Sequence, residues 1–154
     1  MDLQKDKYII VEVIPTHSDA SKGFIAQISA LKLKGIQLLD RFDYRVEDKF
    51  IENHDLRNMI SYDKEMFTYV NNIYFIPEKF KQWVEDYPLL IMENNYTSEY
   101  LKDLKNTKEL IYPYLNLEYS EDVFLKIMDK YHLELTNHLV DILYEAIIYE
   151  GNNR

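Results

Sequence analysis

The most constraining feature of the sequence is a nearly unbroken apolar run over residues 8–16, Y-I-I-V-E-V-I-P-T, which contains a single acid, Glu12. β-Branched residues dominate the run, and Pro15 and Thr16 close it, so it predicts a β-strand that ends in a turn. A strand that is apolar on both faces is typical of the centre of an α/β sheet. A carboxylate in such a strand is costly to bury unless a metal, an arginine or hydrogen bonds hold it. Glu12 is therefore either part of a site or a structurally paired acid.

The composition predicts one globular domain over residues 1–154. The hydrophobic content is 47%, and only 3 glycines and 4 prolines occur in the chain, which argues against low-complexity tracts. The chain has no cysteine, which excludes disulfides, thiolate metal sites and cysteine nucleophiles and favours a cytoplasmic location. No apolar stretch is long enough for a transmembrane helix, and the polar N-terminus leads into no signal-type run, so we expect no membrane association.

The formal net charge of −9 bears on the partners of the protein. It opposes loose binding to a phosphate backbone, because such binding needs lysines and arginines that displace counterions. It does not exclude a nuclease, since bound metal ions neutralise a local acidic site. The charge therefore favours a protein partner over nucleic acid.

The first half of the chain predicts an antiparallel meander of strands. Residues 24–34 form the second strand, in which Leu31 and Leu33 alternate with lysines. Gly35 marks the turn into a third strand over residues 36–46, which alternates again. Residues 47–75 are acidic and rich in asparagine, with short helical signals such as residues 64–67 with Val70.

Helices and short strands are expected to follow. Pro77 suits the first turn of a helix whose buried face holds Phe80, Trp83 and Val84. Residues 89–92 predict a short buried strand, and a further helix starts at residue 98. Residues 110–112 predict a short edge strand that Pro113 ends.

Two helices close the chain. Ser120 is expected to cap the first, with Glu121 and Asp122 in its first turn. Thr136 or Asn137 is expected to cap the second. The residues predicted to be buried are Val123, Phe124, Ile127, Met128 and Tyr131 in the first helix and Leu139, Val140, Leu143, Ala146 and Ile147 in the second.

This order of elements, with an acid on the first strand, resembles the ribonuclease-H-like fold, an α/β fold. That fold has a mixed sheet of three antiparallel strands plus one or two parallel strands, flanked by helices. More specifically, the chain resembles the DEDDh 3′–5′ exonucleases, DnaQ-like proteins that include polymerase III epsilon proofreading subunits. The family's strand V-V-D-x-E-T-T resembles residues 11–16, and its D-R-F resembles residues 40–42. Its V-A-H-N-x-x-F-D-x-x-F-L resembles residues 91–101, and its H-x-A-x-x-D-A resembles residues 138–144.

The resemblance implies a two-metal site for phosphodiester cleavage. In the family, four carboxylates hold two divalent ions that activate a water and stabilise the leaving oxygen, and a histidine acts as general base. The four carboxylate positions hold, in chain order, Glu12, Ile14, Thr97 and Leu143, and the histidine position holds His138, or Leu139 if the register shifts by one residue.

At most one of the four metal carboxylates therefore remains, as Glu12. Hard cations need several oxygen ligands in a fixed geometry, and Ile14 and Leu143 supply none. Glu93 and Asp141 are possible substitute acids. Asp141 lies about 200° around the helix from Leu143 and is expected to point elsewhere.

The resemblance and these departures together predict a catalytically decayed exonuclease-like domain that acts as a binding or regulatory module in nucleic-acid metabolism. No cofactor is expected in that case. The alternative is an active 3′–5′ exonuclease that uses Mg²⁺ or Mn²⁺ and a relocated carboxylate set. A further alternative is an acidic protein that mimics nucleic acid and inhibits a basic partner.

Overall fold

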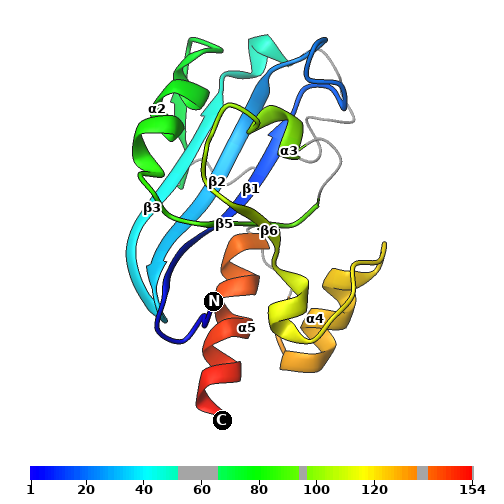
Figure 1. Cartoon of the computed structure of the whole chain (residues 1–154). Coiled ribbons are helices and arrows are strands. Elements are labelled where there is room, and N and C mark those ends of the chain that lie inside the picture. Colours follow the sequence, from blue (N-terminus) through cyan, green and yellow to red (C-terminus); the bar gives the residue numbers. More distant parts are fainter. Residues whose placement is uncertain (52–65, 94–96, 135–138, 154) are drawn as a thin grey trace.

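The computed structural model describes residues 1–51, 66–93, 97–134 and 139–153 (Figure 1). Its centre is a 6-stranded mixed sheet with the strand order β4-β3-β2-β1-β5-β6. The strands are β1 (Lys7–Pro15), β2 (Ile25–Lys34), β3 (Gln37–Val46), β4 (Thr68–Val70), β5 (Leu89–Ile91) and β6 (Lys108–Leu110). This mixed sheet, with helices packed on it, confirms the fold class expected from the sequence.

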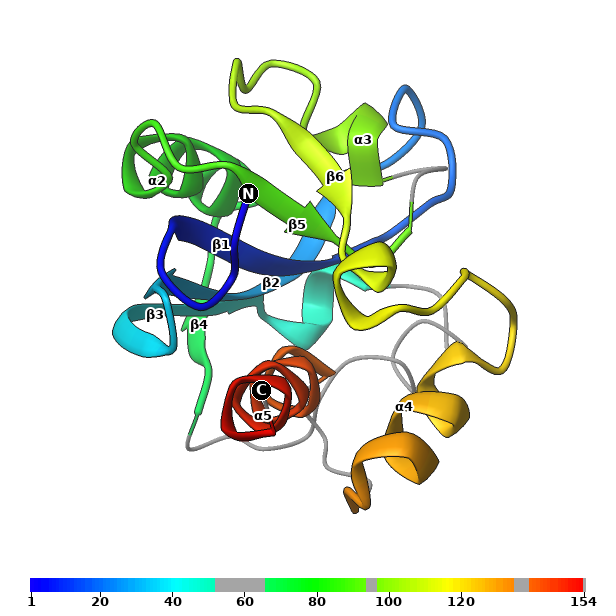
Figure 2. The same ribbon diagram turned by 60° about the horizontal axis from the view of Figure 1, so that its bottom comes forward.

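Helices cover both faces of the sheet (Figure 2). One layer contains α2 (Phe75–Trp83) and the short α3 (Thr97–Tyr100). The other contains α4 (Val123–Tyr131) and α5 (Leu139–Asn152), together with the 3₁₀ turn η2 (Tyr112–Leu115). A second 3₁₀ turn, η1 (Asp48–Phe50), follows β3. No helix among the described residues has the length and apolar character needed to cross a bilayer.

Strand β1 lies inside the sheet, as its apolar run predicts. It pairs antiparallel with β2 and parallel with β5. Ile9 and Val11 enter the core on the α2 side, whereas Tyr8 and Ile10 enter the core on the α5 side. Because both faces are buried, alternate residues of β1 contact different helix layers.

Gly35 is required at the β2–β3 turn that the sequence predicts. Its φ is +58°, in the left-handed region, and a Cβ there would lie 2.5 Å from the carbonyl oxygen of Gln4. The Tyr8 hydroxyl donates a 2.9 Å hydrogen bond to the Gly35 carbonyl from within the core. The turn is thereby tied to both β1 and the N-terminal segment.

Three local predictions are wrong. Thr68–Val70 forms strand β4, parallel to β3, where Val70 was assigned to a helical signal; residues 64 and 65 of that signal lie outside the described residues. Edge strand β6 is Lys108–Leu110, earlier than residues 110–112, because the chain enters the η2 turn at Tyr112. Ser120 does not cap α4: its hydroxyl donates to the Asp122 carboxylate at 2.7 Å, and the helix starts only at Val123.

The buried faces of α4 and α5 agree with the predicted stripes. Val123, Ile127 and Tyr131 are buried from α4, and Phe124 and Met128 pack beside them. On α5, the buried residues are Val140, Ile142, Leu143, Ala146 and Ile147, and Leu139 is partly buried. The expected cap at Thr136 or Asn137 lies outside the described residues.

Leu143 provides a test of this packing. It is fully buried, so Leu143→Ala should lower the free energy of unfolding by about 2–5 kcal/mol, through lost apolar burial and a residual cavity. Urea denaturation measures the change. Leu125→Ala is the matched control, because Leu125 is 66% exposed on α4, and it should change stability by less than about 0.5 kcal/mol. Equal stabilities for the two variants would contradict the buried position of Leu143.

Candidate functional site

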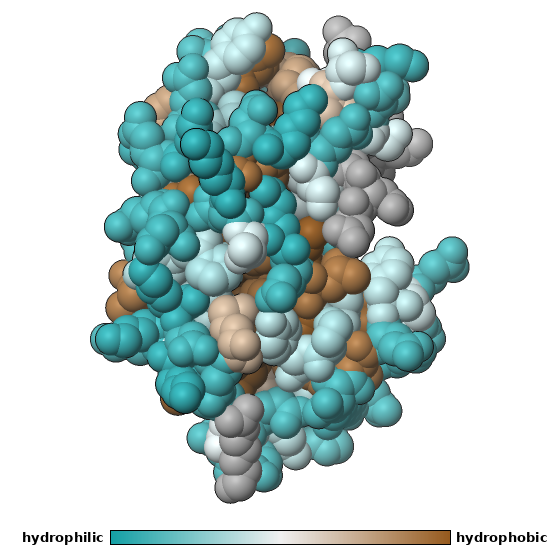
Figure 3. Space-filling model, in the orientation of Figure 1, coloured by the Kyte–Doolittle hydropathy of each residue, from teal (hydrophilic) through white to brown (hydrophobic). Residues whose placement is uncertain are grey.

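A cavity of about 350 Å³ lies where β1, β5, η2 and the segment before α4 meet. In Figure 3 the right side of the molecule is indented above the α4 region, and hydrophobic residues form much of the surface there. The described lining residues include Glu12 and Ile14 from β1, Glu93 and Thr97 from the loop after β5 and the start of α3, and Leu139 from α5. Four residues singled out from the sequence, Glu12, Ile14, Glu93 and Thr97, are thus brought to one place.

The sheet topology explains why Glu12 and Glu93 meet. Parallel strands end at the same edge of a sheet, and β1 and β5 are parallel neighbours. Val11 of β1 pairs with Ile91 of β5. Glu12, which follows Val11, therefore lies at the same end of the sheet as Met92 and Glu93, which follow Ile91. The alternation of β1 turns Glu12 to the side of α4 and α5, away from Val11.

Glu12 is a partly buried acid without a described partner. No described residue forms a hydrogen bond or an ion pair with its carboxylate. The residues around it in the cavity are largely apolar, among them Met92, Val123 and Phe124. Burial disfavours the charged form and raises the pKa of Glu12 from 4.5 to about 7.

Glu93 and Thr97 are joined to each other. The backbone N–H of Thr97 donates a 2.7 Å hydrogen bond to Oε1 of Glu93. Glu93 thereby binds an amide at the start of α3, a position where the helix dipole favours a carboxylate. Thr97 itself is buried, with 3% of its surface exposed.

Leu143 and Asp141 do not line the cavity. Leu143 is part of the core between α5 and the sheet. Asp141 accepts two hydrogen bonds from the guanidinium of Arg41, at 2.7 and 3.1 Å. Asp141 therefore fixes α5 to strand β3, and its carboxylate is held outside the cavity. His138, the expected general base, lies outside the described residues.

The donor set fits a pair of divalent ions poorly. Of the residues at the four carboxylate positions, Glu12 alone carries a carboxylate, and Ile14 and Leu143 offer no oxygen at all. Among the described residues, no three acids or histidines are arranged so that they could share a metal ion. The described side chains therefore do not reproduce the two-metal site that the resemblance implies.

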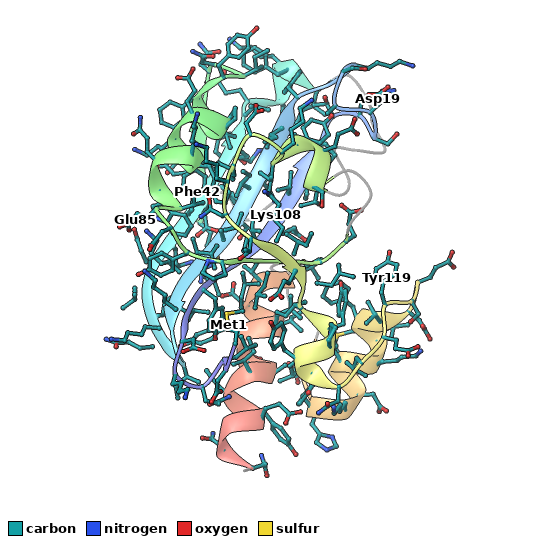
Figure 4. The ribbon with its side chains drawn as sticks, viewed as in Figure 1. Met1, Asp19, Phe42, Glu85, Lys108 and Tyr119 are labelled. Carbon is teal, nitrogen blue, oxygen red and sulfur yellow. The ribbon has the colours of Figure 1, made fainter. Side chains whose placement is uncertain are left out.

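The sequence did not identify the aromatic wall of the cavity. Tyr112, Tyr119 and Phe124 line it, together with the acid Glu121. Figure 4 shows Tyr119 on the segment that leads into α4, at the margin of the molecule. Tyr112 and Phe124 were assigned only to an edge strand and to the stripe of α4, respectively. The available signal was the concentration of aromatic residues between positions 112 and 124.

The raised pKa of Glu12 gives a pH-dependent test. Because the folded pKa of about 7 exceeds the ordinary value of 4.5, the folded state binds more protons between these values. Binding of this proton by Glu12 stabilises the folded state. The stabilisation is fully present below about pH 4.5 and is lost as the pH rises through about 7. Glu12→Gln resembles the protonated form and should raise the free energy of unfolding by up to about 3 kcal/mol at about pH 8. At about pH 4 it should change little.

Urea denaturation of both proteins at the two pH values measures this difference. Glu145→Gln, at an exposed acid on α5, is the control and should show no pH-dependent gain. Destabilisation by Glu12→Gln at about pH 8 would mean that the Glu12 carboxylate has a binding partner in the folded protein.

Comparisons with known proteins agree with this architecture. No protein-family model matches the chain, and no curated protein matches its sequence. Exonuclease I in complex with inhibitor BCBP is similar in structure, with a TM-score of 0.63, 9% identity, and coverage of 95% of this chain and 40% of that chain. Product-bound exonuclease I has a TM-score of 0.63 and 10% identity, and the match covers 96% of this chain and 43% of that chain. The zinc-bound E. coli exonuclease I complex with ssDNA has a TM-score of 0.59 and 9% identity, and the match covers 96% of this chain and 40% of that chain.

The chain therefore spans less than half the length of these exonuclease I chains. At this level of identity the likeness concerns the fold alone. The chain has a ribonuclease-H-like, exonuclease-like fold.

Proposed function

We propose that this chain is an exonuclease-like domain that has lost hydrolytic activity and serves as a binding module for a protein partner in nucleic-acid metabolism. The observation that carries the proposal is the chemistry of the cavity beside Glu12. Ile14 and Thr97 line the cavity where the resemblance places metal carboxylates, and the fourth position is the core residue Leu143.

The surroundings of Glu12 add to this argument. Two-metal cleavage needs enough carboxylates to hold both ions about 4 Å apart, beside the attacking and leaving oxygens. The residues beside Glu12 in the cavity include Met92, Val123 and Phe124, which offer a metal ion no side-chain oxygen.

A second candidate function is an active exonuclease with relocated carboxylates. The observation that favours it is that the same cavity is lined by Glu12, Glu93 and Glu121. The position of Glu93 weighs against it, because the Glu93 carboxylate already accepts the Thr97 amide. Glu121 is exposed, one residue before the Asp122 N-cap of α4. We therefore keep this enzyme as the alternative that an activity assay decides.

The assay is release of nucleotides from 3′-labelled single-stranded DNA and RNA in the presence of millimolar Mn²⁺. The purified protein should release none above the background without protein, because the described lining of the cavity offers too few carboxylates to hold two ions. Glu12→Gln is assayed in parallel as the control for contaminating nucleases.

Release by the wild-type protein that disappears in Glu12→Gln would overturn the proposal and establish the relocated-carboxylate enzyme. Release that is equal in both proteins identifies a contaminant, and removal of that contaminant by further purification should leave no activity. Activity that co-purifies with the wild-type protein through every step would also contradict the proposal.

A further inference from the structure

The cavity beside Glu12 combines one aromatic wall with acidic side chains. In this wall the ring of Tyr112 contacts both other rings: its centroid is 5.7 Å from that of Tyr119 and 6.4 Å from that of Phe124. The Tyr112 hydroxyl donates a 2.6 Å hydrogen bond to the Met92 carbonyl, which holds the ring in place within the core. Electron-rich ring faces of this kind attract organic cations, most strongly where water is excluded.

The described charged residues that line the cavity are all acidic. Glu12, Glu93 and Glu121 line it, and none of its described lining residues is a lysine, an arginine or a histidine. The Glu93 carboxylate is bound to the start of α3, which leaves Glu12 as the acid within the apolar part of the lining. A concave site lined by one sign of charge concentrates ions of the opposite sign.

The lining also restricts which cation the cavity can hold. A divalent metal needs several oxygen ligands in a fixed geometry, which the described residues do not provide. An anion would be repelled, and a neutral apolar group would leave the Glu12 carboxylate buried without a partner among the described residues. An ammonium group on an alkyl chain suits both the acid and the apolar lining of the cavity. Its charge can pair with Glu12 while its methylene groups contact Met92, Val123 and Leu139.

We propose that this cavity is a binding site for the side chain of a lysine carried by the protein partner. The inference rests on the proposed function, since a working pair of metal ions would occupy the same place. A cavity of about 350 Å³ lies at the small end of ligand sites, which suits one long side chain. The net charge of −9 favours approach of a basic segment.

The test uses the full chain, labelled with ¹⁵N and free of metal ions, and two capped amino acids. N-acetyl-lysine amide carries the ammonium group, and N-acetyl-norleucine amide has the same four-carbon stem without it. Backbone amide shifts are followed at about pH 8. We expect lysine amide to shift signals of residues 11–14, Met92 and Glu93, and norleucine amide to leave them unchanged at the same concentration.

Variants then locate the charge that is responsible. Glu12→Gln should weaken binding of lysine amide at least about tenfold, because a charge-assisted hydrogen bond is lost. Glu145→Gln, which removes an exposed acid of α5, should leave the affinity unchanged.

Several results would overturn the inference. These are the absence of saturable shifts with lysine amide, equal shifts with norleucine amide, shifts spread over surface acids, and undiminished binding in Glu12→Gln. The titration contains neither metal nor nucleic acid, so its failure would leave the absence of hydrolysis standing. Conversely, nuclease activity lost in Glu12→Gln would refute the proposed function without any reference to lysine.

Discussion

The burial of β1 on both faces is the constraint on which the rest of the structure depends. Since β1 lies between β2 and β5, its backbone is bonded on both edges, and helices must cover both of its sides. α2 supplies one cover, and α5 with η2 and α4 supplies the other. Glu12 is the one acid in this strand. The cost of burying its carboxylate appears as the raised pKa.

A polar connection between the sheet and α5 is the second organising feature. Arg41 on β3 bonds both Asp43 and Asp141, and Asp43 accepts a 2.7 Å hydrogen bond from Ser29 on β2. This chain of contacts reaches from two strands to the last helix. It uses Asp141, the acid close in sequence to the last metal position of the resembled family, for attachment of α5. Asp141 therefore has a structural role in this protein, and the apolar Leu143 two residues later is part of the core.

Much of the fold could be predicted because its periodic signals are local. The central strand, the β2–β3 turn at Gly35 and the stripes of α4 and α5 follow from apolar spacing and glycine alone. The three-residue strand β4 could not be predicted, because its pairing with β3 is a long-range contact and three residues carry almost no periodicity. Glu12 was recognised from its apolar strand and Glu93 through the resemblance, whereas Glu121 was expected only in the first turn of a helix. Tyr112 and Tyr119 were not, because nothing in the sequence tells whether an aromatic residue lines a cavity or fills the core.

The central proposal is that the cavity beside Glu12 does not hold divalent metal ions. The most direct measurement is addition of Mn²⁺ to the ¹⁵N-labelled protein, because a bound paramagnetic ion broadens the amide signals of nearby residues. The signals of Val11, Glu12, Val13 and Glu93 should lose no more intensity than those around exposed acids such as Glu145, and Glu12→Gln should give the same pattern. Selective loss of the signals around Glu12 at low Mn²⁺ concentration, abolished in Glu12→Gln, would contradict the account.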